Sequence, residues 1–205
     1  MDGLIFDIDG TMWDSTEIVA IAWNEYLKGQ GITDIPVTAE ILRGLFGKTL
    51  PRIAAELFPS FPEPERMRLI DGCCDSEHKA LVKTPAPLYD GLREVLTSLY
   101  EKYPLFIVSN CQAGYIEVFL EGTGLTKLFR GHLCPGDTGH AKADNILAIA
   151  KQYGLKSPVY IGDTMGDFEA CREAGVPFVF ASYGFGQVDN PDYRIEKPAD
   201  LLSIF

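Results

Sequence analysis

Four short runs of apolar residues recur along the chain, and each has about the length of a buried β-strand. They are GLIFDI at 3–8, PLFIVSN at 104–110, PVYIGD at 158–163 and PFVFAS at 177–182. Each run is rich in Val, Ile and Phe and does not alternate between apolar and polar positions. Such continuous runs are typical of strands that are buried on both faces, so the pattern predicts a parallel sheet.

Helical patterns separate these runs. Residues 90–103 place apolar side chains at helical spacing, and the segments 142–154 and 163–175 each end in a glycine, which commonly stops a helix. Strand and helix therefore alternate along most of the chain. This order predicts an α/β fold with a Rossmann-like parallel sheet and helices on both of its faces.

The segment before residue 86 breaks this alternation. Helical patterns fill DSTEIVAIAWNEYLKGQG, TAEILRGLF, TLPRIAAELF and EPERMRLIDGCCDSEHKALV, with no buried-strand run between them. The prolines of KTPAPLYDG at 83–91 mark a linker that leads back to the sheet. The predicted organisation is an α/β core of residues 1–13 and 86–205, with an all-helical cap domain of residues 14–85 inserted after the first strand.

Composition narrows the classes of function. The 205 residues are 46% hydrophobic, which is enough for a packed core, and 18 basic against 29 acidic residues give a net charge of −11. A nucleic-acid binder needs a basic surface, so no nucleic-acid partner is expected. An anionic substrate would need a local cation to overcome the repulsive field of the protein, and a metal ion would supply it.

The same reading predicts a cytoplasmic monomer without a membrane partner. No segment approaches the roughly 18 apolar residues of a membrane helix, and no signal-peptide pattern is evident. The five cysteines are odd in number and lack the spacing of a zinc site, which favours reduced thiols. A nucleophilic role for one of them stays open at this point, because its partners would be spatial.

Polar residues stand where three of the predicted strands end. Because ligands bind beyond the carboxyl ends of parallel strands, these residues are candidates for one site. A lone acid at such a position is more often a helix cap or a solvated residue, but several converging carboxylates need a cation among them, and oxygen ligands suit Mg²⁺. The candidates are Asp7 and Asp9 after the first run, Ser109 and Asn110 after the second, Asp163 and Asp167 after the third, and Lys142 at the start of a helix.

The motifs FDIDGT, VSN, Lys142 and GDTMGD resemble, in order and spacing, the four motifs of the haloacid dehalogenase superfamily. The chain is similar to the branch with a helical cap after the first motif, which includes phosphoglycolate phosphatase and β-phosphoglucomutase. The resemblance implies that Asp7 is a nucleophile that forms an aspartyl-phosphate. It implies that Asp9 is the general acid and base.

The resemblance also implies the remaining roles. Asp163 would bind Mg²⁺ together with Asp7 and the Asp9 carbonyl, and Asp167 would support the metal or Lys142. The groups implied to hold the substrate phosphoryl are Ser109, Asn110 and Lys142, with Thr11 in the tight turn after the first strand. In the cap, LRGLFGKTL at 42–50 resembles the loop that faces the core site, so Arg43 and Lys48 are candidates to meet a substrate carboxylate or hydroxyls. The alternative is that both are solvated cations at helix ends.

Two positions depart from the family pattern, and one motif occurs a second time in a different sequence context. Trp13 stands where small or aliphatic residues are usual, and Ala143 follows Lys142 where proline is common. A second GDT, at 136–138, follows no apolar run and has Ala141 four residues after its acid, so Asp137 is interpreted as a loop residue.

The sequence therefore predicts a phosphoric monoester hydrolase, a Mg²⁺-dependent phosphatase that acts on a small phosphorylated metabolite. A phosphomutase similar to β-phosphoglucomutase would use the same residues and stays an alternative. A non-catalytic protein that binds a phosphometabolite is an alternative of another class, because a fold alone does not guarantee activity. Dehalogenation is not expected, because relatives with that activity lack the second acid, here Asp9.

Overall fold

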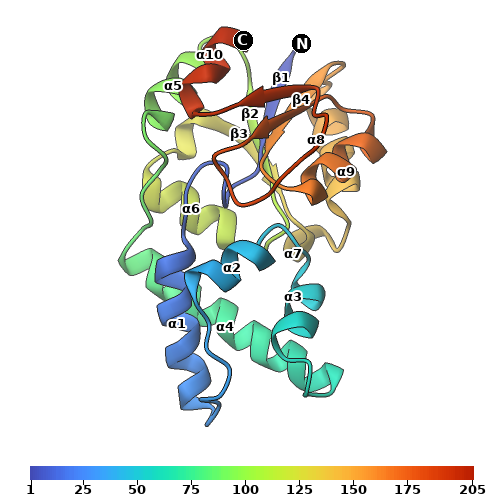
Figure 1. Ribbon diagram of the computed structural model, residues 1–205. Helices are drawn as coiled ribbons and strands as arrows, with labels where there is room; N and C mark the ends of the chain where they lie inside the picture. The colour runs from blue at the N-terminus through green and yellow to red at the C-terminus, as the bar shows by residue number, and fades with distance from the viewer.

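A six-stranded parallel sheet forms the upper half of the computed structural model, which describes residues 1–205 (Figure 1). The strand order is β3-β2-β1-β4-β5-β6. The strands are β1 (Gly3–Phe6), β2 (Leu105–Val108), β3 (Phe129–Leu133), β4 (Pro158–Gly162), β5 (Phe178–Ala181) and β6 (Tyr193–Ile195). The prediction of an α/β fold with a parallel sheet is confirmed.

Helices cover both faces of this sheet. Side chains alternate along β1, so Leu4 and Phe6 belong to one hydrophobic cluster and Ile5 to a second cluster on the other face. The first cluster includes residues of α5 (Leu92–Tyr100), α6 (Tyr115–Thr123) and α10 (Leu201–Ile204). The second includes residues of α8 (Lys142–Tyr153) and α9 (Met165–Ala174). None of the helices is long and apolar enough to span a membrane.

Between β1 and α5 the chain is helical, as expected. The helices are α1 (Thr16–Gly29), α2 (Ala39–Leu45), α3 (Leu50–Leu57) and α4 (Glu63–Lys83). Figure 1 shows them together below the sheet, at the end away from both termini. Their buried residues join the same hydrophobic cluster as one sheet face, so packing is continuous between the two parts. The boundaries 1–13, 14–85 and 86–205 stay predictions.

Two segments connect the helices α1 to α4 with the sheet. The outgoing segment after β1 lies beside the returning proline-containing segment, where Trp13 and Leu88 form an isolated antiparallel bridge and Tyr89 N donates to Met12 O at 3.0 Å. The expected linker at 83–91 therefore holds the exit and the return of the chain together.

The second GDT lies in a different setting from the one expected. The strand β3 directly precedes it, and Asp137 lies in the short helix α7 (Pro135–Thr138), so its interpretation as a loop residue without a preceding strand was wrong. The strand escapes the apolar pattern because β3 is an edge strand with the sequence FRGHL, and Phe129 is the one buried residue in it. Asp137 is exposed and accepts a hydrogen bond from the Cys134 thiol at 3.1 Å.

Candidate active site

The carboxyl ends of three neighbouring strands meet at one point of the sheet. Asp7 follows β1, Ser109 follows β2 and Asp163 follows β4, and β1 lies between the other two. The chain runs from β1 outward to β2 and β3, then returns to the other side of β1 as β4. This change of direction opens a crevice at the strand ends, where α/β proteins commonly bind ligands.

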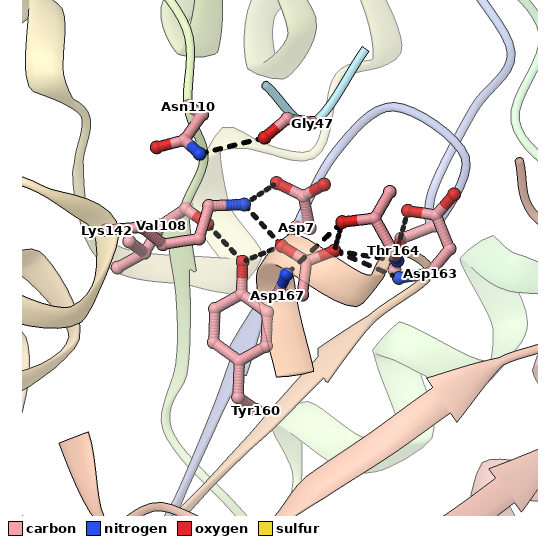
Figure 2. Close-up of polar contacts among 10 residues, drawn as sticks. Asp7, Gly47, Val108, Asn110, Lys142, Tyr160, Asp163, Thr164 and Asp167 are labelled. Carbon is pink, nitrogen blue, oxygen red and sulfur yellow. Dashed lines mark hydrogen bonds and ion pairs between the residues drawn. The ribbon is translucent and has the colours of Figure 1, made fainter. Parts of the chain in front are cut away.

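Lys142 joins two carboxylates of this crevice. Its Nζ lies 3.1 Å from Asp7 Oδ1 and 2.5 Å from Asp167 Oδ1, and all three side chains are almost fully buried (Figure 2). The lysine is the first residue of α8, so the helix start directs its amine to the ends of β1 and β4. Lys142 thus stands at the start of a helix, as the sequence predicts, and contacts these two acids, whereas its catalytic role stays a prediction.

Asp167 is held at the start of α9. Its Oδ2 accepts hydrogen bonds from Thr164 N at 3.0 Å and Thr164 Oγ1 at 2.7 Å, and also from Asp163 N at 3.2 Å. Thr164 Oγ1 in turn accepts from Asp167 N, which completes a capping box. With Oδ1 on Lys142, both oxygens of Asp167 are occupied. The geometry therefore fits support of Lys142 better than direct metal binding.

Asp163 is enclosed by glycine-containing turns. Its Oδ1 accepts from Thr11 Oγ1 at 3.2 Å and its Oδ2 from Phe185 N at 2.7 Å. Gly10 has φ of +79°, and a Cβ there would lie 2.0 Å from Asp163 Oδ2. Only glycine allows both this backbone conformation and this close approach. Thr11, expected in the tight turn and among the substrate-binding groups, thus also holds Asp163.

The carboxylates of the crevice carry more negative charge than the one nearby ammonium group can balance. Oxygens of Asp7, Asp163 and Asp167 lie within 4.8 Å of one another, and Lys142 is the one cation between them. Burial raises the pKa of Asp7 to about 6 against the opposing effect of Lys142. Burial also raises the pKa of Asp163 well above its usual value, helped by the charges of Asp167 and Asp7. Although burial opposes it, the same acids raise the pKa of Lys142 above its usual value. A divalent cation with oxygen ligands fits this excess of negative charge.

Asp9 lies in the same pocket but in a separate hydrogen-bond network. Its Oδ1 accepts from Trp13 Nε1 at 2.9 Å, Ser15 Oγ at 2.6 Å and Tyr115 OH at 2.9 Å. Burial raises the pKa of Asp9 to about 7, although these donors favour its ionised form. A carboxyl with a pKa near neutrality is suited to giving and taking a proton.

The loop between α2 and α3 closes over the crevice. Gly47 O accepts a hydrogen bond from Asn110 Nδ2 at 2.9 Å, and Figure 2 shows this bond above Asp7. The Asn110 amide oxygen points away from Gly47, is buried and has no hydrogen-bond partner. The pocket under this loop is also lined by Phe46 and Lys48.

The structure brings only one of the two cap cations into this pocket. Lys48 lines it, with Nζ 2.6 Å from Glu56 Oε2. Arg43 does not line it and instead donates to Asp14 Oδ2 through Nε at 3.0 Å and Nη2 at 2.8 Å. The substrate roles expected for Arg43 and Lys48 stay predictions, and the geometry favours Lys48.

Several pocket residues escaped the sequence reasoning. Glu77 of α4 is buried, and burial raises its pKa to about 8 against the effect of hydrogen bonds from Gln112 and Trp23. The donors to Asp9 were missed as well, although the unusual Trp13 was a signal. Tyr115 is separated from Asp9 by 106 positions along the chain, so no local sequence pattern connects them.

Comparison with known proteins supports the same assignment. Residues 4–181 match the haloacid dehalogenase-like hydrolase family. The chain belongs to this family. The predicted superfamily and the predicted hydrolase class are therefore confirmed.

Relatives of this haloacid dehalogenase-like hydrolase are named as phosphatases. It is 26% identical over 219 residues to an N-acetylmuramic acid 6-phosphate phosphatase of Pseudomonas aeruginosa, with 100% of this chain and 94% of the relative covered. It is 29% identical over 212 residues to a phosphoglycolate phosphatase of Xylella fastidiosa, with 98% and 90% covered. It is 28% identical over 211 residues to the pyrophosphatase PpaX of Listeria innocua, with 98% and 94% covered.

A solved structure shows the same fold. The haloacid dehalogenase-like family hydrolase SP0104 from Streptococcus pneumoniae superposes with a TM-score of 0.87 at 23% identity, covering 100% of this chain and 98% of the other. The names of two of these relatives agree with the predicted phosphoric monoester hydrolase, whereas the third is named for pyrophosphate, which is an anhydride.

Proposed function

We propose that the protein is a Mg²⁺-dependent phosphatase that hydrolyses a small phosphorylated metabolite through an aspartyl-phosphate on Asp7. The observation that carries this proposal is the buried cluster of Asp7, Lys142, Asp163 and Asp167 at the carboxyl ends of β1 and β4. We also propose that it acts as a cytoplasmic monomer without a membrane or nucleic-acid partner, in line with the sequence analysis.

The metal would be held by Asp7, Asp163 and the backbone carbonyl of Asp9, with Asp167 supporting it through Lys142. Three carboxylates against one ammonium leave a net negative charge that a divalent cation balances. When bound, the ion offsets the charge of the phosphoryl group as it is transferred.

Asp7 is suited to the nucleophilic step. Lys142 donates to its Oδ1, which leaves Oδ2 free to attack. That oxygen forms a bond to phosphorus while the bond from phosphorus to the ester oxygen breaks. Lys142 also lies next to the position of the phosphoryl oxygens and helps to balance their charge, together with Ser109 and Asn110.

Asp9 is suited to carry the proton in both half-reactions. Its Oδ1 is fixed by three donors, and the second oxygen can give a proton to the departing alkoxide. Asp9 then takes a proton from water as the water oxygen attacks phosphorus. The bond between phosphorus and Asp7 breaks, which releases inorganic phosphate and restores both acids.

The cap loop closes this chemistry off from bulk solvent. The bond between Gly47 and Asn110 places the loop over Asp7, so a substrate must be small enough to lie under it. Excluding water strengthens the electrostatic interactions within the pocket.

The test is phosphate release from p-nitrophenyl phosphate and a panel of small phosphate esters, with Mg²⁺ and with EDTA. We expect Mg²⁺-dependent turnover, and a fall of at least about a thousandfold in kcat for Asp7→Asn, because the amide is a poor nucleophile. Asp144→Asn is the matched control, because Asp144 is exposed on α8 and makes no hydrogen bond through its side chain. Absence of turnover with every ester, or full turnover by Asp7→Asn, would contradict the proposal.

A further inference from the structure

Glu77 is a buried carboxyl that the proposed reaction does not use. It lies on α4, is 3% exposed, and lines the same pocket as Asp7 and Asp9. It comes from the cap, whereas the acids of the reaction come from the ends of the strands. A group in this position faces the part of a substrate that the cap encloses.

Glu77 has two hydrogen-bond donors and no cation partner. Trp23 Nε1 donates to Oε2 at 2.6 Å, and Gln112 Nε2 donates to Oε1 at 2.5 Å. Lys48, the cation on the same pocket wall, is engaged by Glu56. A carboxylate can accept about four hydrogen bonds, so about half of its capacity is unused. A buried carboxyl with unused acceptors is costly unless a ligand supplies donors.

The surroundings of Glu77 divide the pocket into two regions. The groups that would handle the phosphoryl are Asp7, Ser109 and Asn110, which follow the strands. The cap contributes an apolar and aromatic wall of Trp23, Phe46, Leu50 and Ile53. Glu77 is the carboxyl within that wall, beside the indole of Trp23. An apolar wall with a fixed acceptor suits a carbon skeleton that carries hydroxyl groups.

We propose that Glu77 selects phosphate monoesters whose alcohol part carries hydroxyl groups, that is, polyol or sugar phosphates. This inference rests on the proposed phosphatase function. A hydroxyl can donate to Glu77 when the carboxyl is ionised and can accept from it when the carboxyl is protonated. A carboxylate or a second phosphate in the same place meets a negative charge once Glu77 is ionised, which disfavours its binding.

The test compares two small esters that differ in this respect. Glycerol 3-phosphate carries a diol, and 2-phosphoglycolate carries a carboxylate, while p-nitrophenyl phosphate reports turnover that depends on neither. The kcat/KM of each, with Mg²⁺, is measured at about pH 9, above the pKa of about 8 that burial gives Glu77, for the wild type, Glu77→Gln and Asp71→Asn. Asp71 is the control, because it is exposed on the same helix and the substitution removes the same charge.

We expect the wild type and Asp71→Asn to prefer glycerol 3-phosphate over 2-phosphoglycolate by about tenfold or more. Glu77→Gln is expected to lower this ratio by about tenfold, because it removes the charge that repels the carboxylate. If that variant does not fold, Glu77→Asp replaces it. The shorter side chain keeps the charge, so it should retain the discrimination against 2-phosphoglycolate while kcat/KM for glycerol 3-phosphate falls.

Other outcomes overturn the inference in distinguishable ways. A wild-type preference for 2-phosphoglycolate would point to Lys48 as the selecting group. An equal loss on all three esters in Glu77→Gln, with an unchanged ratio, would assign Glu77 to cap packing alone. Absence of turnover of all three by the wild type would instead overturn the proposed function, and with it this inference.

Discussion

At the scale of single residues, the donors around Asp9 should set the pH at which the enzyme works. Tyr115 OH donates to Asp9 Oδ1 at 2.9 Å and lowers the pKa of that carboxyl toward its value of about 7. Tyr115→Phe removes this bond to the ionised form, so the pKa of Asp9 should rise. Protonated Asp9 would then persist to higher pH, so the fall of kcat/KM on the alkaline side of the pH profile should shift to higher pH.

The measurement is kcat/KM for p-nitrophenyl phosphate against pH, with Mg²⁺ present throughout. Tyr100→Phe on α5 is the matched control, because Tyr100 is exposed and does not line the pocket. A limb that stays in place, or moves toward acid, in Tyr115→Phe would show that Asp9 is not the titrating general acid.

Residue types and local spacing predicted part of this site. Asp7, Asp163 and Asp167 could be found because strand ends bring short motifs together, and a carboxylate four residues after another lies on the same side of a helix start. The surroundings of Asp9 could not be found in this way. Tyr115 and Glu77 reach the pocket from α6 and α4, and only tertiary packing places them there.

At the scale of elements, the loop between α2 and α3 can dock on the core only with glycine at its centre. Gly47 has φ of +86°, and a Cβ there would lie 2.9 Å from Thr164 Cγ2 and 3.1 Å from Thr164 Oγ1. Gly47→Ala therefore meets both backbone strain and the residue that caps α9. We expect kcat/KM for p-nitrophenyl phosphate to fall about 10- to 100-fold, because the loop no longer closes over Asp7. The strain should lower the free energy of unfolding by about 1–2 kcal/mol.

Gly44→Ala provides a matched control for this loop. Gly44 lies within α2, and a Cβ there would meet no atom within 4 Å, so alanine should leave turnover unchanged and favour the helix. Gly47→Ala combined with Thr164→Ser removes the methyl contact and should recover part of the lost kcat/KM. Equal turnover in Gly47→Ala and Gly44→Ala, measured beside urea unfolding, would show that closure of this loop is not needed.

The same scale explains which elements the sequence revealed. The strands β1, β2, β4 and β5 are buried on both faces and therefore appear as continuous apolar runs. The edge strands β3 and β6 expose part of their residues, so FRGHL and YRI carry no such pattern. Their pairing with β2 and β5 comes from the sheet that they extend. Local pattern thus predicts the centre of the sheet and fails at its edges.

At the scale of the whole molecule, stability should depend on pH and on a divalent cation. Burial raises the pKa of Asp7 from 3.8 to about 6, that of Asp9 from 3.8 to about 7, and that of Glu77 from 4.5 to about 8. The unfolded chain thus loses these protons at lower pH than the folded chain. Between each pair of values the folded state binds more protons, so the free energy of unfolding falls as pH rises.

The stabilisation from these groups is complete below their unfolded pKa values and is lost as pH rises through the folded ones. In EDTA, the urea midpoint should therefore decline from about pH 4 to about pH 8. Repulsion within a chain of net charge −11 acts in the same direction.

Mg²⁺ should remove a large part of the decline, because binding at Asp7 and Asp163 favours their ionised forms in the folded state alone. NaCl at equal ionic strength separates this binding from general screening. A midpoint that rises with pH in EDTA would contradict the raised pKa values, and equal midpoints in Mg²⁺ and NaCl would contradict a metal site at the strand ends.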